Sequence, residues 1–255
     1  SAKRAIWRST AAGGLAVGNL DDPLVSALLS AVDGRRVGFT LGEPGPGQFG
    51  VVDGVLVGDG VALTRADRIS PPGAHNVANA LAAAALAIGY GIPAAAVADG
   101  LAGYRPQPHR NAYVATVAGV DYVDDSKATN PHAARAALDA YPRVVWIAGG
   151  QLKGVDVADL VRGVADRLAG AVLLGVDRAE VAAALARHAP DVPVVRVDRA
   201  DDEAMADVVR AAAGLAKPGD TVLLSPAAAS RDMFVSYAER GEAFAAAVRS
   251  LAHRH

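Results

Sequence analysis

Residues 122–134 read YVDDSKATNPHAA, and this stretch joins the end of an expected strand to the start of an expected helix. Tyr122 and Val123 close an apolar run. Asn130 and Pro131 are typical of a helix start, because asparagine caps the first turn and proline fits the first helical position. Residues 124–130 are therefore predicted to form a polar loop at the carboxyl end of a strand, where open α/β sheets bind ligands.

The alternation of strand and helix continues to the end of the chain. A hairpin of strands at 113–117 and 120–123 precedes the loop. The further elements expected are strands at 144–148, 172–175, 192–197 and 221–225 and helices at 157–168, 180–188, 202–216 and 235–252. Apolar strands that alternate with helices favour a mostly parallel sheet covered on both faces. Residues 106–255 are therefore predicted to be a doubly wound, Rossmann-like α/β domain.

Residues 1–105 have a less regular pattern and are predicted to be a separate part of the chain. The elements expected there are the end of a helix at 1–9, strands at 14–19, 36–40, 49–52 and 55–57, and helices at 24–32, 75–89 and 94–102. The dipeptide Asp53-Gly54 predicts a hairpin. Pro106 and Pro108, with their polar neighbours, predict a linker between the two parts.

The composition excludes several classes of function. Apolar residues make up 52% of 255 residues, which is enough for a sizeable core, and the net charge of −2 gives no electrostatic reason to expect nucleic acid or membrane lipid as a partner. The absence of cysteine excludes disulfides, thiolate metal sites and a cysteine nucleophile. The uncharged residues 76–98 contain Gly89, Gly91 and Pro93, so we expect a buried helix and a turn rather than a membrane span. With no targeting signal visible, we expect a cytoplasmic protein.

Lysine is rare in this sequence, so each lysine is a candidate for a specific functional role. Of 25 basic residues only four are lysine, namely Lys3, Lys127, Lys153 and Lys217. A lysine kept against such a bias can serve as a compact amine that is modified or shifts its pKa. Chance placement is the alternative, and the count alone does not decide between the two.

Two further polar groups are candidates for nucleotide binding, although the chain contains no GxxxxGK[ST] phosphate-binding loop. Asn76 and Asn79 lie three residues apart at a helix start, so their amides face the same way and can read the edge of a base. A pair of helix-capping side chains is the alternative. Arg110, at the expected linker, can clamp a phosphate or a carboxylate, or it can be a solvated linker arginine.

Three loops follow expected strands and carry small or polar residues. Besides DDSKATN they are AGGQLKG at 148–154 and LLSPAAAS at 223–230. Each by itself can be an ordinary turn between strand and helix. Together they place Lys127, Thr129, Lys153 and Ser230 on one rim, which suits an anionic substrate with more than one carboxylate.

The sequence resembles the D-glutamate-adding members of the Mur ligase family, the UDP-N-acetylmuramoyl-L-alanine:D-glutamate ligases. The segments that carry the resemblance are GAHNVANALAAA, QPHRNA, DDSKATNPHAA, IAGGQLKG and LLSPAAASRDMFVSYAERGEAF. It extends from about Lys3 to Leu251. It implies that residues 1–105 are the C-terminal portion of a central ATP-binding domain and that residues 106–255 are a Rossmann-like domain that binds the amino acid.

The resemblance also implies roles for single residues. They are, as catalytic residues, Lys3 and Lys127; as ATP-binding residues, Asn76, Asn79, Arg110 and Asp125; and as D-glutamate-binding residues, Lys127, Thr129, Lys153, Ser230 and Tyr237. Lys3 matches a lysine that is carbamylated in the family, a change that would make it an oxygen ligand suited to Mg²⁺. Tyr237 stands where the family has phenylalanine, and Asp124 where some members have asparagine.

The activity implied is ATP-dependent amide ligation in peptidoglycan synthesis, with Mg²⁺, UDP-N-acetylmuramoyl-L-alanine and D-glutamate. ATP would phosphorylate the muramoyl-alanine carboxylate, and the D-glutamate amine would displace phosphate from the resulting acyl phosphate. We expect a monomer. The UDP-binding domain and the P-loop of the family are not in this sequence, so we expect the chain alone to be inactive. A related amide ligase such as folylpolyglutamate synthase, and a non-catalytic ligand-binding module, are the alternatives.

Overall fold

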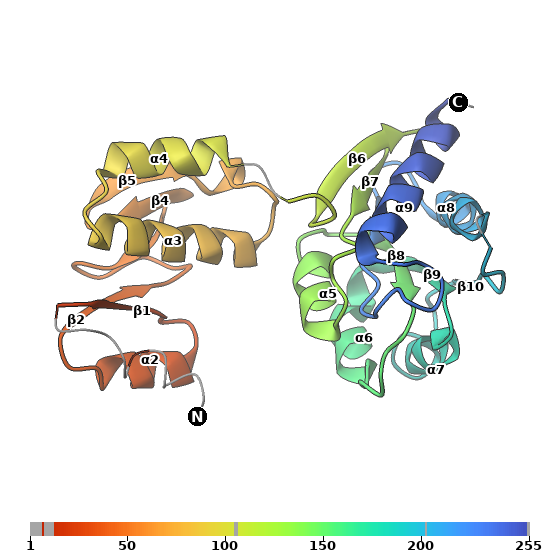
Figure 1. Ribbon diagram of the computed structural model, residues 1–255, viewed down its shortest axis with the longest axis horizontal. Helices are drawn as coiled ribbons and strands as arrows, with labels where there is room; N and C mark the ends of the chain where they lie inside the picture. Colours follow the sequence, from red (N-terminus) through yellow and green to blue (C-terminus); the bar gives the residue numbers. More distant parts are fainter. Residues whose placement is uncertain (1–6, 8–12, 105–106, 202, 254–255) are drawn as a thin grey trace. The chain divides into compact units, whose positions relative to one another are not determined.

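The computed structural model describes residue 7 and residues 13–104, 107–201 and 203–253. The chain divides into two compact units, Ser1–Arg105 and Pro106–His255. Each unit has its own sheet and its own hydrophobic core (Figure 1). Lys3 and most of the helix expected at 1–9 lie outside the described residues.

The described part of the first unit contains a five-stranded mixed sheet in the order β1-β2-β3-β4-β5. The strands are β1 (Leu15–Asn19), β2 (Arg35–Phe39), β3 (Phe49–Val52), β4 (Val55–Gly58) and β5 (Val61–Arg65), and the helices are α2 (Pro23–Ser30), η2 (Ala66–Arg68), α3 (Ala74–Gly89) and α4 (Ala94–Gly103). The first two neighbouring pairs are parallel and the last two are antiparallel. The hairpin predicted at Asp53-Gly54 joins β3 to β4, and both residues have positive φ.

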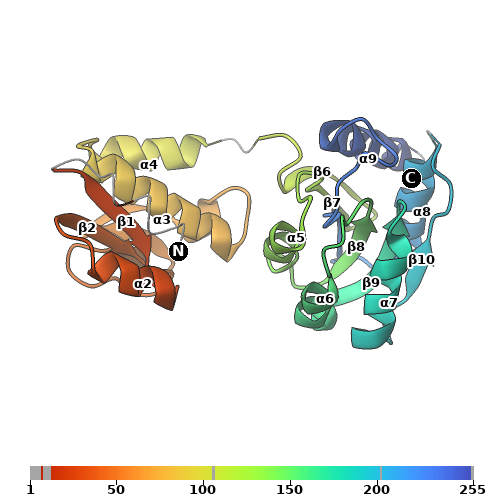
Figure 2. The ribbon, with the colours of Figure 1, turned by 60° about the horizontal axis from the view of Figure 1, so that its bottom comes forward.

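Helices cover both faces of this sheet. Buried alanines of α3 pack with Phe39, Phe49 and Leu56 in one core, on the face that Val17 also joins. Gly18, whose position alternates with Val17 along β1, faces Val25 and Leu29 of α2. The unit is therefore layered as helix, sheet and helices (Figures 1 and 2).

Within residues 107–201 and 203–253, the second unit forms a six-stranded sheet in the order β10-β9-β8-β11-β7-β6. The strands are β6 (Ala112–Val117), β7 (Val120–Asp124), β8 (Val144–Gly149), β9 (Leu168–Leu174), β10 (Val194–Arg196) and β11 (Thr221–Leu224), and the helices are α5 (Pro131–Leu138), α6 (Ala158–Val164), η3 (Ala165–Arg167), α7 (Arg178–His188), α8 (Ala204–Leu215) and α9 (Tyr237–Ala252). All neighbouring strands are parallel except the β6–β7 pair. The predicted doubly wound fold is confirmed.

Two hydrophobic cores sandwich this sheet because its central strands are buried on both faces. Trp146 and Ala148 of β8 pack into one core with α5, α6 and α7, whereas Val145 and Ile147 pack into the other with α8 and α9. All six residues of β8 are buried. An uninterrupted apolar strand of this kind is what a two-sided parallel sheet requires.

The arrangement of connections defines where a ligand can enter. β11 lies between β7 and β8, and the chain leaves β7 and β8 toward the α5–α6 face but leaves β11 toward the α9 face. The loops after these three strands therefore diverge at the carboxyl edge of the sheet. Such a topological switch point is the usual ligand-binding position in open α/β sheets.

The structure differs from the expected elements at two places. The helix expected at 157–168 ends at Val164 and is followed by a short 3-10 turn, so that Leu168 already pairs with Val144 as the first residue of β9. The apolar run 168–174 is compatible with either a helix or a strand, and it forms a strand because it pairs with β8. Strand β5, which had not been expected, is an edge strand that pairs with β4. Its partly exposed side chains leave a weak pattern in the sequence.

Candidate functional site

The predicted loops follow three strands that are immediate neighbours. Thr221 of β11 pairs with Asp121 of β7 and with Val144 of β8, so the three strands run in parallel register to the same edge. Lys127 and Thr129 follow β7, Lys153 follows β8, and Ser230 follows β11. Tyr237 is the first residue of α9, beyond the same β11 loop. The structure thus brings these five residues to one edge of the second unit.

Residues 124–130 adopt the strand–loop–helix geometry predicted. The side chain of Asn130 caps α5 by accepting a hydrogen bond from the Ala133 amide at 2.9 Å, and Pro131 opens the helix. Asp124 accepts the Ser126 amide at 2.9 Å through Oδ1, and its Oδ2 lies 2.7 Å from Nδ1 of His109. The loop is therefore held from within by its own polar side chains.

Asp125 points into the protein, where both carboxylate oxygens have donors. Oδ1 accepts the Asn111 amide at 3.0 Å, and Oδ2 accepts the Ser225 hydroxyl at 2.9 Å. Only 6% of the residue is exposed, and burial raises the pKa of Asp125 to about 6, against the weaker lowering effect of those two hydrogen bonds. Asn111 in turn accepts the Tyr141 hydroxyl at 2.7 Å, and burial raises the pKa of Tyr141.

Lys127 lies at the exposed side of the same loop. Its ammonium group donates to Oε1 of Gln107 at 2.7 Å and lies 5.7 Å from the centroid of the Tyr237 ring. The His109 ring meets the same tyrosine edge-on at 6.3 Å. A cation beside an aromatic face at this distance is attracted to it, and the tyrosine, 38% exposed, leaves room for a ligand.

The loop after β8 is held by its backbone. The Gly149 amide donates to Pro226 O at 2.9 Å, and Gln151 and Ala229 exchange two backbone hydrogen bonds. Gly149 and Gly150 have φ of 116° and 129°, values that other residues rarely adopt. Lys153 also has positive φ and is exposed, and its ammonium group has no hydrogen bond or ion pair with the described residues.

The loop after β11 contains a buried serine and a half-buried aspartate with different surroundings. Ser230 is 4% exposed, and its carbonyl accepts the amides of Met233 and Phe234. Asp232 accepts the Val176 amide at 2.9 Å through Oδ2, while its buried Oδ1 has no hydrogen-bond partner among the described residues. Thr129, by contrast, is exposed. The rim therefore combines two exposed groups, Thr129 and Lys153, with a recessed serine.

Sequence reasoning did not single out Arg240, Ser126 or His109. Arg240 is 1% exposed and donates hydrogen bonds to the hydroxyl and the carbonyl of Ser126 and to the carbonyl of Ala228. A signal for it was present, because Arg240, Phe244 and Val248 recur every four residues on one stripe of α9. An arginine on the apolar face of a predicted helix marks a buried cation.

The asparagines of the first unit lie at the start of α3. The N-cap of this helix is Gly73, so neither Asn76 nor Asn79 occupies the cap position. Asn76 instead donates to Pro72 O at 3.2 Å, and Asn79 is exposed. In the second unit, Arg110 is exposed and its charge lowers the pKa of Asp125 slightly, against the larger effect of burial.

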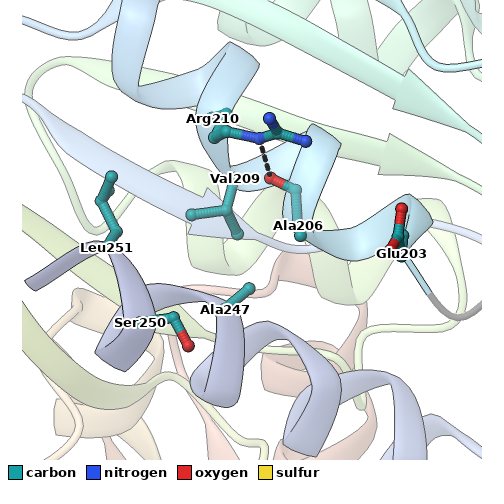
Figure 3. A pocket seen from close by; sticks show the side chains of 7 residues that line it. All are labelled: Glu203, Ala206, Val209, Arg210, Ala247, Ser250 and Leu251. Carbon is teal, nitrogen blue, oxygen red and sulfur yellow. Dashed lines mark hydrogen bonds between the residues drawn. The ribbon is translucent and has the colours of Figure 1, made fainter. Parts of the chain in front are cut away.

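Two pockets of the second unit lie wholly or mostly away from the predicted site residues. The pocket in Figure 3, of about 400 Å³, lies between α8 and α9, where Glu203 and Arg210 stand on one side and Ser250 and Leu251 on the other. None of the predicted site residues lines it. A second cavity, of about 250 Å³, is lined by His109 and Asp124 together with Tyr113 and Arg249.

The described residues form neither a metal-binding cluster nor a membrane-spanning helix. In the described part of the chain, no group of three or more His, Cys, Asp or Glu side chains is placed to hold a metal ion. No helix formed by the described residues is long and apolar enough to cross a bilayer. Lys3, the metal ligand expected from the resemblance, lies outside those residues.

Comparison with known proteins identifies relatives of both units. Residues 109–228 match the family model "Mur ligase, glutamate ligase domain". The chain is 54% identical over 253 residues to the UDP-N-acetylmuramoylalanine--D-glutamate ligase of Thermobifida fusca, covering 94% of this chain and 54% of that protein. It is 50% identical over 273 residues to the enzyme of that name from Mycobacterium bovis, with 94% and 55% covered. The chain thus spans about half the length of these relatives.

Solved structures show the same fold at low sequence identity. MurF from Acinetobacter baumannii superposes with a TM-score of 0.69 at 20% identity, covering 97% of this chain and 54% of that one. A pseudomurein peptide ligase type C from Methanothermus fervidus gives a TM-score of 0.62 at 17% identity, with 99% and 58% covered. At this identity the likeness concerns the fold alone.

Proposed function

The chain belongs to the Mur ligase family, and we propose that it is part of an ATP-dependent ligase that adds D-glutamate to UDP-N-acetylmuramoyl-L-alanine in peptidoglycan synthesis. The observation that carries the proposal is the rim of the second unit. Lys127 and Lys153 follow the two strands that flank β11, and Ser230 follows β11 itself. Two cations and a serine at adjacent strand ends suit an amino acid with two carboxylates.

We assign the amino acid to the second unit, residues 106–255. The ammonium groups of Lys127 and Lys153 would neutralise the two carboxylates, and the hydroxyls of Thr129 and Ser230 would donate hydrogen bonds to them. The ring of Tyr237 would form one wall beside Lys127. D-Glutamate carries a net negative charge at neutral pH, so two lysines at the rim favour its binding electrostatically.

We assign ATP to residues that the first unit and the start of the second unit supply. Residues 1–105 would be the C-terminal portion of the ATP-binding domain, with Asn76 and Asn79 reading the adenine edge. Arg110 and Asp125 would act on the ATP side of the second unit. Asp125 would do so with the lone pairs that its hydrogen bonds to Asn111 and Ser225 leave open.

Mg²⁺ would accompany ATP, and a carbamylated Lys3 would be one of its ligands. The described residues offer no cluster of carboxylates or imidazoles that fits this ion, so we derive no step through it. ATP and small-molecule substrates are the partners we propose, for a protein that acts as a monomer in the cytoplasm.

The reaction proposed is the formation of an amide through an acyl phosphate. A carboxylate oxygen of the muramoyl-alanine substrate would attack the terminal phosphorus of ATP and release ADP. The D-glutamate amine would then attack the activated carbonyl carbon, and the C–N bond would form as the C–O bond to phosphate breaks, with loss of a proton from nitrogen. The residues of this chain would contribute by binding and orienting the amine, which is a large share of such catalysis.

The alternatives gain no support from the relatives. The two sequence relatives quoted above are both named D-glutamate ligases, and neither is named a folylpolyglutamate synthase. Neither relative is named as a non-catalytic binding module. Replacing D-glutamate by another amino acid in the assay distinguishes the first alternative, and the absence of any turnover would favour the second.

Phosphate release tests the proposal directly. The product of the complete reading frame is incubated with MgATP, UDP-N-acetylmuramoyl-L-alanine and D-glutamate, and the 255-residue chain is assayed beside it. We expect release by the complete product only when D-glutamate is present, and none by the chain alone. Release that is independent of the amino acid would overturn the proposal, and turnover by the chain alone would overturn its expected inactivity.

A further inference from the structure

Arg240 is a cation buried without a carboxylate partner. It is 1% exposed and lies with Phe244 and Val248 on the stripe of α9 that faces the sheet. No ion pair joins its guanidinium to a carboxylate in the described residues. Burying an arginine without an ion pair costs free energy. We therefore ask which parts of the protein its hydrogen bonds hold together.

Its hydrogen bonds connect two loops of the rim. Nε donates to the Ser126 hydroxyl at 2.9 Å, and Nη2 donates to the Ser126 carbonyl at 2.8 Å. Nη1 and Nη2 donate to the Ala228 carbonyl at 3.2 and 3.3 Å. One planar guanidinium thus fastens the loop after β7 to the loop after β11, a geometry that a lysine could not reproduce.

Ser126 extends this connection to the start of α9. Its residue is fully buried, and its hydroxyl donates to the Tyr237 carbonyl at 2.7 Å while it accepts Nε of Arg240. Lys127 is the next residue along the chain, and its ammonium group lies 5.7 Å from the Tyr237 ring. The backbone atoms fixed by Ser126 and Arg240 are therefore those that set the spacing of Lys127 and Tyr237.

The charge of Arg240 persists at neutral pH. Burial lowers the pKa of its guanidinium to about 10, and the carboxylates of Asp124 and Asp232 act in the opposite direction. A protonated guanidinium keeps all of its N–H groups as donors. The hydrogen bonds to both loops are therefore present under the conditions in which a ligase would work.

We propose that Arg240 and Ser126 are positioning residues for the amino-acid substrate, and this rests on the function proposed above. They touch no substrate. Their hydrogen bonds hold Lys127 and Tyr237 at the separation that a dicarboxylic amino acid needs, so their loss weakens the binding of that substrate and spares the binding of ATP.

Variants of the complete reading-frame product test this proposal through separate KM values. In Ser126→Ala and Arg240→Met we expect the KM for D-glutamate to rise about tenfold or more, because misplacement of a binding group by about 1 Å is costly. We expect the KM for ATP to stay within about twofold of the wild type. Arg240→Lys retains the charge but lacks the fork, so an intermediate KM for D-glutamate is expected. Arg187→Met, at an exposed arginine in the last turn of α7, is the control.

Amide hydrogen exchange supplies a readout that does not depend on turnover. We expect faster exchange at residues 126–129 and 228–230 in Ser126→Ala than in Arg187→Met, with the strands unchanged. Unchanged exchange in these loops overturns the proposal whatever the activity. Equal increases in both KM values overturn it too, because they indicate a general structural role. If the wild type shows no D-glutamate-dependent turnover, both the proposed function and the positioning role of Arg240 and Ser126 are overturned. If the wild type is active and both variants have normal KM values, only the positioning role is overturned.

Discussion

The loops on either side of β11 are held in place by different means. Residues 124–130, after β7, are fixed by side chains, since Asp124, Asp125 and Ser126 each accept or donate hydrogen bonds inside the protein. Residues 149–154, after β8, are fixed by backbone hydrogen bonds and by glycines at positive φ.

This difference shows two ways of presenting a lysine at a strand end. Lys127 stands on a side-chain network, with its ammonium group already bound to Gln107 and beside Tyr237. Lys153 extends from a backbone frame into solvent. We therefore expect changes in residues 124–130 to alter catalysis and the pH dependence of stability. In residues 149–154 we expect changes to glycine to alter stability and changes to Lys153 to alter substrate affinity.

The largest effect is expected from Lys127→Met in the complete reading-frame product. Removing a preorganised cation from the rim should lower kcat/KM for D-glutamate by about 10²–10³-fold. The matched control is Lys217→Met, an exposed lysine that precedes β11 at the opposite edge of the sheet. Steady-state phosphate release measures both. A Lys127→Met variant with a third or more of the wild-type kcat/KM would contradict the assignment.

The second prediction concerns pH and the side-chain network of the first loop. Burial raises the pKa of Asp125 from 3.8 to about 6, so the folded state binds this proton more tightly than the unfolded state. Its contribution therefore favours folding at low pH and is lost as the pH rises from about 4 to about 6. The difference between a pKa of 3.8 and one of about 6 corresponds to at most about 3 kcal/mol.

Asp125→Asn removes this titration while keeping the shape of the side chain. We expect the free energy of unfolding of the variant, relative to the wild type, to increase by about 2–3 kcal/mol between pH 4 and pH 7. Urea titrations followed by the fluorescence of the buried Trp146 report on the second unit. A difference between the two proteins that stays constant with pH would show that Asp125 titrates normally.

The third prediction tests the backbone frame of the second loop. Gly150 has φ of 129°, and a Cβ there would meet the carbonyl of Ala229, so Gly150→Ala should cost about 2–3 kcal/mol of stability. Gly154 has φ of 76° and open space around it, so Gly154→Ala should cost about 1 kcal/mol. If urea unfolding gives the two variants equal losses of stability, the close approach of Gly150 to the Ala229 carbonyl does not determine the conformation of this loop.

The smallest effect is expected from Lys153→Met. Because the ammonium group has no partner in the described residues, the free energy of unfolding should change by less than about 0.5 kcal/mol. The KM for D-glutamate should rise about tenfold, which corresponds to one charge-assisted hydrogen bond. A Lys153→Met variant that loses stability but keeps its KM for D-glutamate would show that Lys153 stabilises the fold and does not bind the substrate.

Much of the second unit could be predicted from the sequence because its pattern is local. The N-cap of α5, Asn130, accepts the amide of Ala133 three residues later, and the apolar run of β8 is unbroken. The start of β9 could not be predicted, because residues 165–168 fit a helix as well as a strand and only pairing with β8 decides. The edge strand β5 was missed because an edge strand needs no continuous apolar face.

The candidate site divides in the same way. Lys127, Thr129, Lys153 and Ser230 were predicted from the sequence because each lies in a short polar or small-residue segment after an expected strand, whereas Tyr237 was predicted from the family resemblance alone. The Ser126–Arg240 contact joins residues 114 positions apart, and no local pattern links them. The burial of Asp125 likewise depends on Ser225, which is 100 positions away.

The sequence by itself determined the order of strands and helices, the caps and turns, and the chemical types available at each strand end, since these depend on residues close together along the chain. Only the tertiary structure decided that β11 lies between β7 and β8, and so which loops are neighbours. It also decided which polar side chains face inward and which face solvent. The physical reason is that burial, and with it the pKa of Asp125 and the hydrogen bonds of Arg240, arises from contacts between distant segments.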